Sequence, residues 1–258
     1  MPSDWLRPDW DAPAAVKALM STRQGGSSAA PFESMNLARP ALPAVDDAVD
    51  GNRRRLAAAL GATPVYLQQV HGSDVVQLGC ADLQPDAAVH RADASVTSTP
   101  GLACTVLVAD CLPVLYCAGN GRAVAAAHAG WRGLAAGVLE NTVAGLCRRA
   151  DCAPAEVQAW LGPCIGPRQF EVGADVLEAF GLTADLGADA AFVMRRRADG
   201  STRWLADLPE LARRRLGAAG VARVFGGCWC TVEEPSRFFS FRRDGLTGRM
   251  AACIALAS

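Results

Sequence analysis

The sequence predicts an α/β protein, because apolar runs of strand length alternate along the chain with segments of helical spacing. The chain has 258 residues, of which 51% are hydrophobic, enough for a sizeable core. We therefore expect a single domain spanning residues 1–258. The first 45 or so residues are rich in Pro, Gly, Ser and Ala, which predicts irregular structure there, with 1–20 as an irregular N-terminal segment.

The first half of the chain predicts one helix and four strands before its long second helix. Acids at the start and arginines near the end of 46–60 suit the helix dipole, and this helix is expected to end at Gly61. Apolar runs predict buried strands at 65–70, 102–108, 113–117 and 122–127. Residues 133–150 have apolar side chains at helical spacing and predict a single helix of about four turns.

The second half predicts fewer elements. A strand at 157–162 runs into the loop GPCIGP, whose prolines cannot continue a sheet. Helices are expected over 172–180 and near 206–217, and strands near 221–225 and 249–256. The stretch 181–203 is polar and weakly patterned, and its three arginines predict a solvated face (Arg195, Arg196 and Arg197).

Charge and cysteine content narrow the range of partners. The chain has 25 basic and 26 acidic residues, a formal net charge of -1, which argues against nucleic acid and anionic membranes. No apolar run approaches the roughly 18 to 20 residues of a membrane span, and no signal sequence is recognisable. The ten cysteines lie scattered in apolar stretches and are expected to be mostly buried free thiols. We expect a cytoplasmic protein, a monomer or weak homodimer, with small-molecule partners.

Three residues that can bind a metal follow predicted strands. His71 in QVHG and His128 in AAHAG each come directly after one, and Cys111 in ADCLP lies in the turn between two. Two imidazoles and a thiolate suit zinc, and three protein ligands with an open fourth position are typical of a catalytic site. Their spacing matches no local zinc motif, so structural roles for these residues stay open. The third histidine, His90, is expected to be a structural hydrogen-bonding residue.

A glycine-rich turn follows the second of these histidines. Gly130 and Gly133 flank Arg132 at the start of the predicted helix, an arrangement that favours an anion such as phosphate. The alternative is that the glycines only permit a tight turn and that Arg132 forms a local salt bridge.

Several ordered motifs resemble one known family. From about residue 20 to the C-terminus they are MNLA, GNRRRLA, QVHG, ADCLPV, AAHAGWRG with GLAAGVLENTV, LGPCIGP with FEVG, and FSFRRDGLTGRMA. This series is similar to that of the laccase-domain, or multicopper polyphenol oxidase, proteins. Members are now often described as purine nucleoside phosphorylases, and the family is also known for peptidoglycan editing. The resemblance implies mixed sheets layered between helices, in a fold related to cysteine deamidase toxins.

The resemblance also implies a metal site and activities. It places one zinc, with copper possible, on His71, Cys111 and His128. The implied reactions are phosphorolysis of adenosine, inosine and S-methyl-5'-thioadenosine, and deamination of adenosine. The older polyphenol oxidase label fits poorly, because a multicopper site needs many histidines and the chain has three.

Further polar residues are candidates for binding the substrate, and two other functions compete. Arg132 is expected to hold phosphate, with Asn36, Arg53 and Gln69 as polar groups near the site and Trp131 as a group that could stack on a purine. In a second hypothesis, a thiolate–imidazole pair (Cys111 and His128) makes the protein a cysteine hydrolase or amidase acting on peptidoglycan precursors. A third hypothesis is a zinc-bearing scaffold without turnover.

Overall fold

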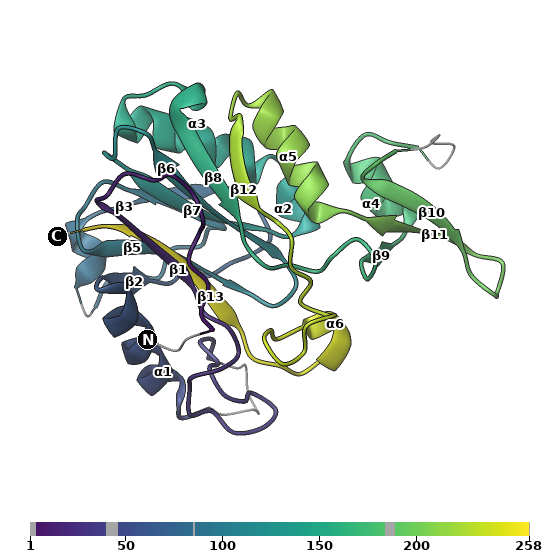
Figure 1. The fold of residues 1–258 in the computed structure, drawn as a ribbon, viewed down its shortest axis with the longest axis horizontal. Coiled ribbons are helices and arrows are strands. Elements are labelled where there is room, and N and C mark those ends of the chain that lie inside the picture. The colour runs from purple at the N-terminus through teal and green to yellow at the C-terminus, as the bar shows by residue number, and fades with distance from the viewer. Residues whose placement is uncertain (1–3, 40–45, 85, 184–188, 258) are drawn as a thin grey trace.

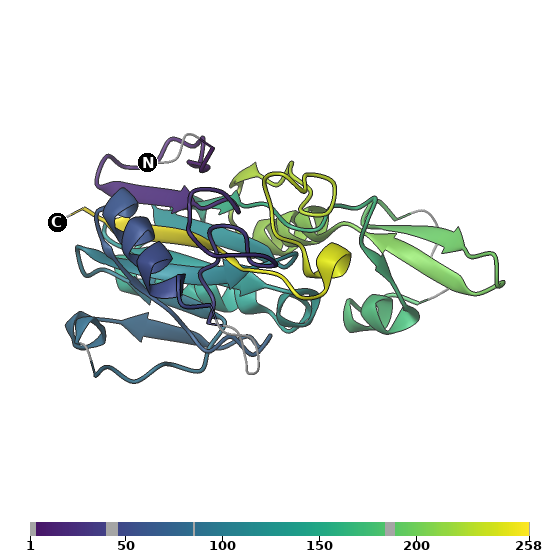
Figure 2. The same cartoon turned by 90° about the horizontal axis from the view of Figure 1, so that it is seen from below.

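Two β-sheets stacked face to face form the centre of the molecule, and helices cover their outer faces (Figures 1 and 2). This computed structural model describes residues 4–39, 46–84, 86–183 and 189–257. The first sheet has the strand order β1-β13-β5-β2, formed by Val16–Met20, Met250–Leu256, Leu102–Val108 and Thr63–Val65. The second has the order β12-β8-β6-β7-β4-β3, formed by Arg223–Gly226, Val157–Leu161, Leu112–Ala118, Val124–Ala129, Ala94–Thr97 and Val75–Leu78.

The helices complete a four-layer arrangement. Helix α1 (Val49–Leu60) packs on the outer face of the four-stranded sheet, whereas α3 (Val138–Ala150) and α5 (Leu208–Ala218) pack on that of the six-stranded sheet. The remaining helical segments are short: α2 (Trp131–Ala135), α4 (Ala174–Ala179), α6 (Phe241–Asp244) and the 3-10 turns Cys80–Leu83 and Pro154–Glu156. Among the described residues, no helix has the length and apolar character needed to cross a membrane.

Because each central strand is buried on both faces, these strands appear in the sequence as continuous apolar runs. In β5, Cys104 and Val106 point into the core between the two sheets, while Ala103 points toward α1. The strands predicted at 102–108 and 157–162 are confirmed, as is the end of the first helix at Gly61, which adopts the left-handed conformation with φ 67°.

Several other sequence predictions were wrong. The segment 1–20 contains β1, which pairs with β13 along its whole length. The predicted strand 65–70 is displaced, because β2 ends at Val65 and the following run forms only an isolated bridge between Gln68 and Arg91. Strands β3 and β4 were missed.

The long helix predicted over 133–150 is two helices. Gly137 separates α2 from α3 with φ 93°, a left-handed conformation that a helix cannot contain. A break at this point lets α2 stay beside β7 while α3 runs across the sheet.

A third, antiparallel sheet projects from the body together with α4 (Figure 1). It has the order β10-β11-β9, formed by Phe192–Arg196, Thr202–Ala206 and Glu171–Val172. This hairpin has no signal in the sequence, because only Phe192 in β10 is buried and the strand therefore lacks the apolar alternation of a half-buried sheet. The three arginines at 195–197 are exposed, as predicted.

Candidate metal site and pocket

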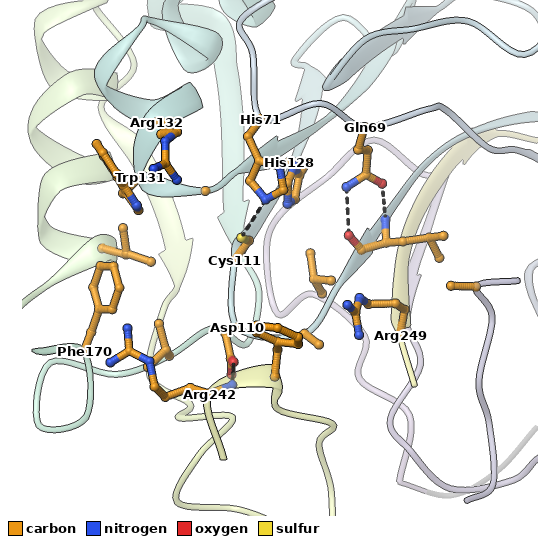
Figure 3. Close-up of a pocket in the computed structure, with 18 of the residues that line it drawn as sticks. Gln69, His71, Asp110, Cys111, His128, Trp131, Arg132, Phe170, Arg242 and Arg249 are labelled. Carbon is orange, nitrogen blue, oxygen red and sulfur yellow. Dashed lines mark hydrogen bonds between the residues drawn. The ribbon is translucent and has the colours of Figure 1, made fainter. Parts of the chain in front are cut away.

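Three predicted metal ligands come together where the two central sheets meet (Figure 3). His71 lies between β2 and β3, Cys111 between β5 and β6, and His128 within β7 rather than after it. One ligand atom of each lies within 4.8 Å of those of the others, and Cys111 Sγ lies 3.8 Å from His71 Nε2. The geometry is that of a group of donors that a single metal ion could bridge.

Asp93, which the sequence analysis did not single out, organises two of these ligands. Its buried carboxylate lies 2.8 Å from His128 Nδ1, and this leaves His128 Nε2 for the metal site. The same carboxylate accepts hydrogen bonds from the backbone N–H groups of Val70, His71 and Gly72 at 2.8 to 3.0 Å. The Asp93 carboxylate therefore does two things: it holds the turn in which His71 has a φ of 61°, and it orients the ring of His128.

The histidines set the charge state of the thiol. Burial raises the pKa of Cys111, but hydrogen bonds and the positive charges of His128 and His71 outweigh this effect and lower the pKa to about 6. Burial lowers the pKa of His128, while its bonds to Asp93 and Cys111 raise the pKa above its usual value. The site thus favours a thiolate, the form of cysteine that binds metals.

Two glycines of the predicted anion-binding turn are required by close packing. A Cβ atom on Gly130 would lie 2.9 Å from His71 Cδ2 and 3.0 Å from Cys111 Sγ. A Cβ atom on Gly133 would lie 2.6 Å from the carbonyl oxygen of Gly72. The helix that follows, α2, has five residues, too few for a strong dipole at its N-terminus. The two glycines therefore allow this turn to pack closely against the segments that carry the metal ligands.

Asp110 connects the metal site to the C-terminal part of the chain. It has a φ of 95°, and its carboxylate accepts hydrogen bonds of 2.6 Å from the Thr231 hydroxyl and from the backbone N–H of Arg242. These bonds hold α6 against the turn that carries Cys111. These hydrogen bonds join segments that are more than a hundred residues apart, so no local pattern in the sequence predicts them.

A cavity of about 640 Å³ opens onto the three ligands. This volume is within the range for a ligand the size of a nucleoside. Besides the metal ligands its wall has aromatic, basic and amide side chains, namely Trp131, Phe170, Phe241, Arg132, Arg242, Arg249 and Gln69. The cavity therefore combines apolar ring surfaces with an excess of positive charge.

Two of the four predicted substrate-binding residues line this cavity. Arg132 is exposed and lies over the ring of Trp131, 4.3 Å from its centroid. Gln69 lines the cavity too, although its amide exchanges two hydrogen bonds with the backbone of Leu107. Trp131 is half-buried at the cavity wall.

The other two do not line the cavity. Asn36 is buried, and its amide bonds to the backbone of Ala38, to Asp46 and to the backbone N–H of Arg249. Arg53 donates to the carbonyl of Leu37 and stacks on a tyrosine.

The remaining histidine has the expected role, whereas the cysteines match the prediction only in part. His90 Nε2 lies 2.6 Å from the Asp82 carboxylate, so its role as a structural hydrogen-bonding residue is confirmed. All ten cysteines are free thiols, as predicted, but they are not mostly buried: five are buried, three are half-buried and two are exposed.

Comparison with known proteins identifies the family. The family model described as multi-copper polyphenol oxidoreductase laccase matches residues 17–257. The chain belongs to this family. A purine nucleoside phosphorylase of Pseudomonas aeruginosa is 51% identical, over 98% of each chain. The purine nucleoside phosphorylase YfiH of Escherichia coli is 50% identical, over 98% of this chain and 99% of its own.

Solved structures share the fold. A protein of Neisseria meningitidis matches with a TM-score of 0.86 and 44% identity, over 99% of this chain and 100% of its own. YlmD of Geobacillus stearothermophilus matches with a TM-score of 0.85 and 33% identity, over 100% of this chain and 98% of its own. The predicted α/β domain and the family resemblance are thereby confirmed.

Proposed function

We propose that the protein is a metal-dependent purine nucleoside phosphorylase whose substrates are adenosine, inosine and S-methyl-5'-thioadenosine. The observation that carries this proposal is the group of His71, Cys111 and His128 in the wall of a nucleoside-sized cavity that also has aromatic and basic side chains. Relatives about half identical over nearly their full length bear the name purine nucleoside phosphorylase, which supports the proposed reaction.

The donor set fits zinc, with copper as a second possibility. Two imidazole nitrogens and a thiolate are ligands that both metals accept, and His128 has its second nitrogen on a carboxylate, as metal-binding histidines usually do. Bound there, the metal would supply Lewis-acid polarisation of a substrate atom or a water of lowered pKa. The described residues contain one such group of three donors, which does not support a multicopper polyphenol oxidase.

The chain's own residues have distinct tasks in this proposal. The aromatic side chains Trp131 and Phe170 shield the purine from water and hold it in place. Arg132 and Gln69, which line the cavity, contact the substrate. Asn36 bonds to the backbone of Arg249, and Arg53 bonds to that of Leu37, so these two residues hold the backbone next to the cavity. A phosphate oxygen then bonds to C1' of ribose as the C1'–N9 bond breaks; the purine keeps the electron pair of that bond and takes up the proton that hydrogen phosphate loses.

Deamination of adenosine is proposed as a second reaction of the same cavity. Water takes the place of phosphate, attacks C6 of adenine, and ammonia leaves. The sequence has neither the H-x-E nor the P-C-x-x-C motif of the nucleobase deaminases, so the proton-transfer groups must differ from theirs.

The decisive experiment combines metal analysis with a phosphate-dependence assay. Purified protein should contain about one zinc per chain, and cleavage of the three nucleosides should require phosphate. Replacing His71, Cys111 or His128 by alanine should remove metal and activity together. Metal content that survives all three substitutions would mean that the metal lies elsewhere.

A second candidate function is supported by one specific arrangement. Cys111, His128 and Asp93 form the order nucleophile, base and orienting carboxylate of a cysteine hydrolase, and the proposed relation to cysteine deamidase toxins agrees with it. A ligand thiolate cannot be a free nucleophile at the same time. A chelator that does not react with thiols should abolish phosphorolysis, and zinc should restore it. Metal-free protein that keeps full activity until Cys111 is alkylated would support the hydrolase instead.

A further inference from the structure

Arg249, the residue just before β13, faces the cavity from a side that the sequence analysis did not consider. Figure 3 shows its guanidinium across the group of His71, Cys111 and His128 from Trp131 and Phe170. Arg132 and Arg242 lie on the side of Trp131 and Phe170, whereas Arg249 lies on the other side of the metal ligands, 5.8 Å from the centroid of the Phe241 ring.

The guanidinium of Arg249 has unused hydrogen-bonding capacity although it is half-buried. Its Nη1 donates to the carbonyls of Thr247 and Gly248 at 3.0 and 3.1 Å. Within the described residues, Nε and Nη2 have no hydrogen-bond partner, and no carboxylate forms an ion pair with Arg249. A cation withdrawn from water normally has a counter-charge, so this one is poised for an anion from outside the chain.

The backbone around Arg249 is fixed. Its N–H donates to the side-chain oxygen of Asn36 at 2.9 Å, and its carbonyl accepts from the N–H of Leu37 at 3.1 Å. Asn36 is itself buried and fully bonded. The structure therefore holds this arginine at one place on the cavity wall, as a preorganised binding group requires.

Arg249 lines the same cavity as the three metal ligands (Figure 3). Burial lowers the pKa of its guanidinium, and the negative charges of Cys111 and Asp110 offset this lowering only in part. The other two cavity arginines are exposed and differently engaged. Arg132 lies on Trp131, and Arg242 Nη1 donates to the carbonyl of Glu171 at 3.2 Å.

We propose that Arg249 anchors the phosphate co-substrate beside the metal ligands, and that Trp131 and Phe170 hold the purine on the opposite side. This inference rests on the proposed phosphorolysis and assigns the phosphate to Arg249 in place of Arg132. The free Nε–H and Nη2–H can bind two phosphate oxygens side by side, a geometry that guanidinium offers and ammonium does not.

Titration calorimetry of the zinc-loaded protein with inorganic phosphate tests the inference directly. Arg249→Gln should weaken phosphate binding about 10- to 100-fold, because one charge-assisted, two-pronged contact is lost. Arg249→Lys should recover part of the affinity. Arg149→Gln, an exposed arginine on α3 outside the cavity, is the matched control and should bind phosphate as the wild type does. Zinc content and circular dichroism establish that each variant is folded.

Kinetics separate the two arginines. With Arg249→Gln the KM for phosphate should rise while the KM for the nucleoside changes little. With Arg132→Gln the KM for the nucleoside should rise instead. Phosphate affinity that depends on Arg132 and not on Arg249, or wild-type protein that binds no phosphate, overturns the inference. If the wild type cleaves no nucleoside, the proposed function fails, but the calorimetry still tests Arg249 on its own.

Discussion

Asp93 supports two of the three candidate metal ligands, because its one carboxylate bonds to the His128 ring and to three backbone N–H groups in the turn that holds His71. In Asp93→Asn, an NH₂ group replaces one of the two carboxylate oxygens. Both oxygens accept hydrogen bonds, so the NH₂ group faces a donor whichever way the amide is turned. We expect zinc affinity to fall about 10- to 100-fold, the usual effect of removing such a supporting group. Competition with a chromophoric chelator measures it.

Asp74→Asn is the control for this substitution, since the Asp74 carbonyl accepts from the Asp93 N–H at 3.3 Å while the residue is exposed. It should leave zinc affinity unchanged. Equal affinities in Asp93→Asn and wild type would show that the ligands orient themselves without the carboxylate.

Gly130 offers a second residue-scale prediction, on packing alone. Its φ of -66° suits alanine, so Gly130→Ala meets no backbone penalty. The added methyl group, however, would collide with His71 and Cys111 at about 3 Å. We expect a folded protein with greatly reduced zinc content, measured by elemental analysis. Gly217→Ala, where nothing lies within 4 Å of the new atom, should retain full zinc content.

At this scale the sequence predicted the residues that have a local motif and missed those that act through distant contacts. His71, Cys111 and His128 each lie in a short ordered motif. Asp93, Asp110 and Arg249 form their contacts with segments that are distant in the sequence. The residues next to them contain no motif that predicts these contacts. For the same reason, Asn36 was expected near the substrate but is found holding Arg249.

At the scale of elements, the break between α2 and α3 depends on one residue. Gly137 has φ 93°, where a side chain is strained, so Gly137→Ala should lower the free energy of unfolding by about 1 to 2 kcal/mol. Gly145, inside α3, is the matched comparison, because an added Cβ would meet neighbours at ordinary contact distances of 3.7 Å and beyond. Gly145→Ala should raise the free energy of unfolding by up to about 1 kcal/mol through helix propensity.

Denaturant unfolding of both variants measures these changes. If Gly137→Ala were as stable as wild type, the helices could join without strain, and the helix predicted over 133–150 would be a low-energy alternative.

Burial decided which elements the sequence could predict. β5 and β8 are buried on both faces and appear as apolar runs with clear ends. β10 is exposed over all but its first residue, and β3 has four residues of mixed burial, so neither has a periodic signal. β1 was missed because its position depends on pairing with β13, more than two hundred residues away.

At the scale of the whole molecule, the candidate metal site joins the two stacked sheets. The chain crosses from the four-stranded to the six-stranded sheet once between β2 and β3 and again between β5 and β6. His71 lies on the first crossing and Cys111 on the second, while His128 belongs to the six-stranded sheet itself. A metal bound to these three residues would link the β2–β3 and β5–β6 connections to β7. Since unfolding separates the three ligands, the metal binds the native state in preference to the unfolded chain.

Zinc should therefore stabilise the whole fold. At a free concentration about 100 times its dissociation constant, a ligand that binds only the native state adds about 2.7 kcal/mol. For a domain of this size that corresponds to a rise in Tm of roughly 5 to 10 °C. Calorimetric scans with zinc and with a chelator measure it, and Cys111→Ala should have nearly the same Tm in both. If the wild type also melts at the same temperature in both, the three residues bind no metal strongly enough to matter. The Cys111, His128 and Asp93 arrangement would then be the better account of the site.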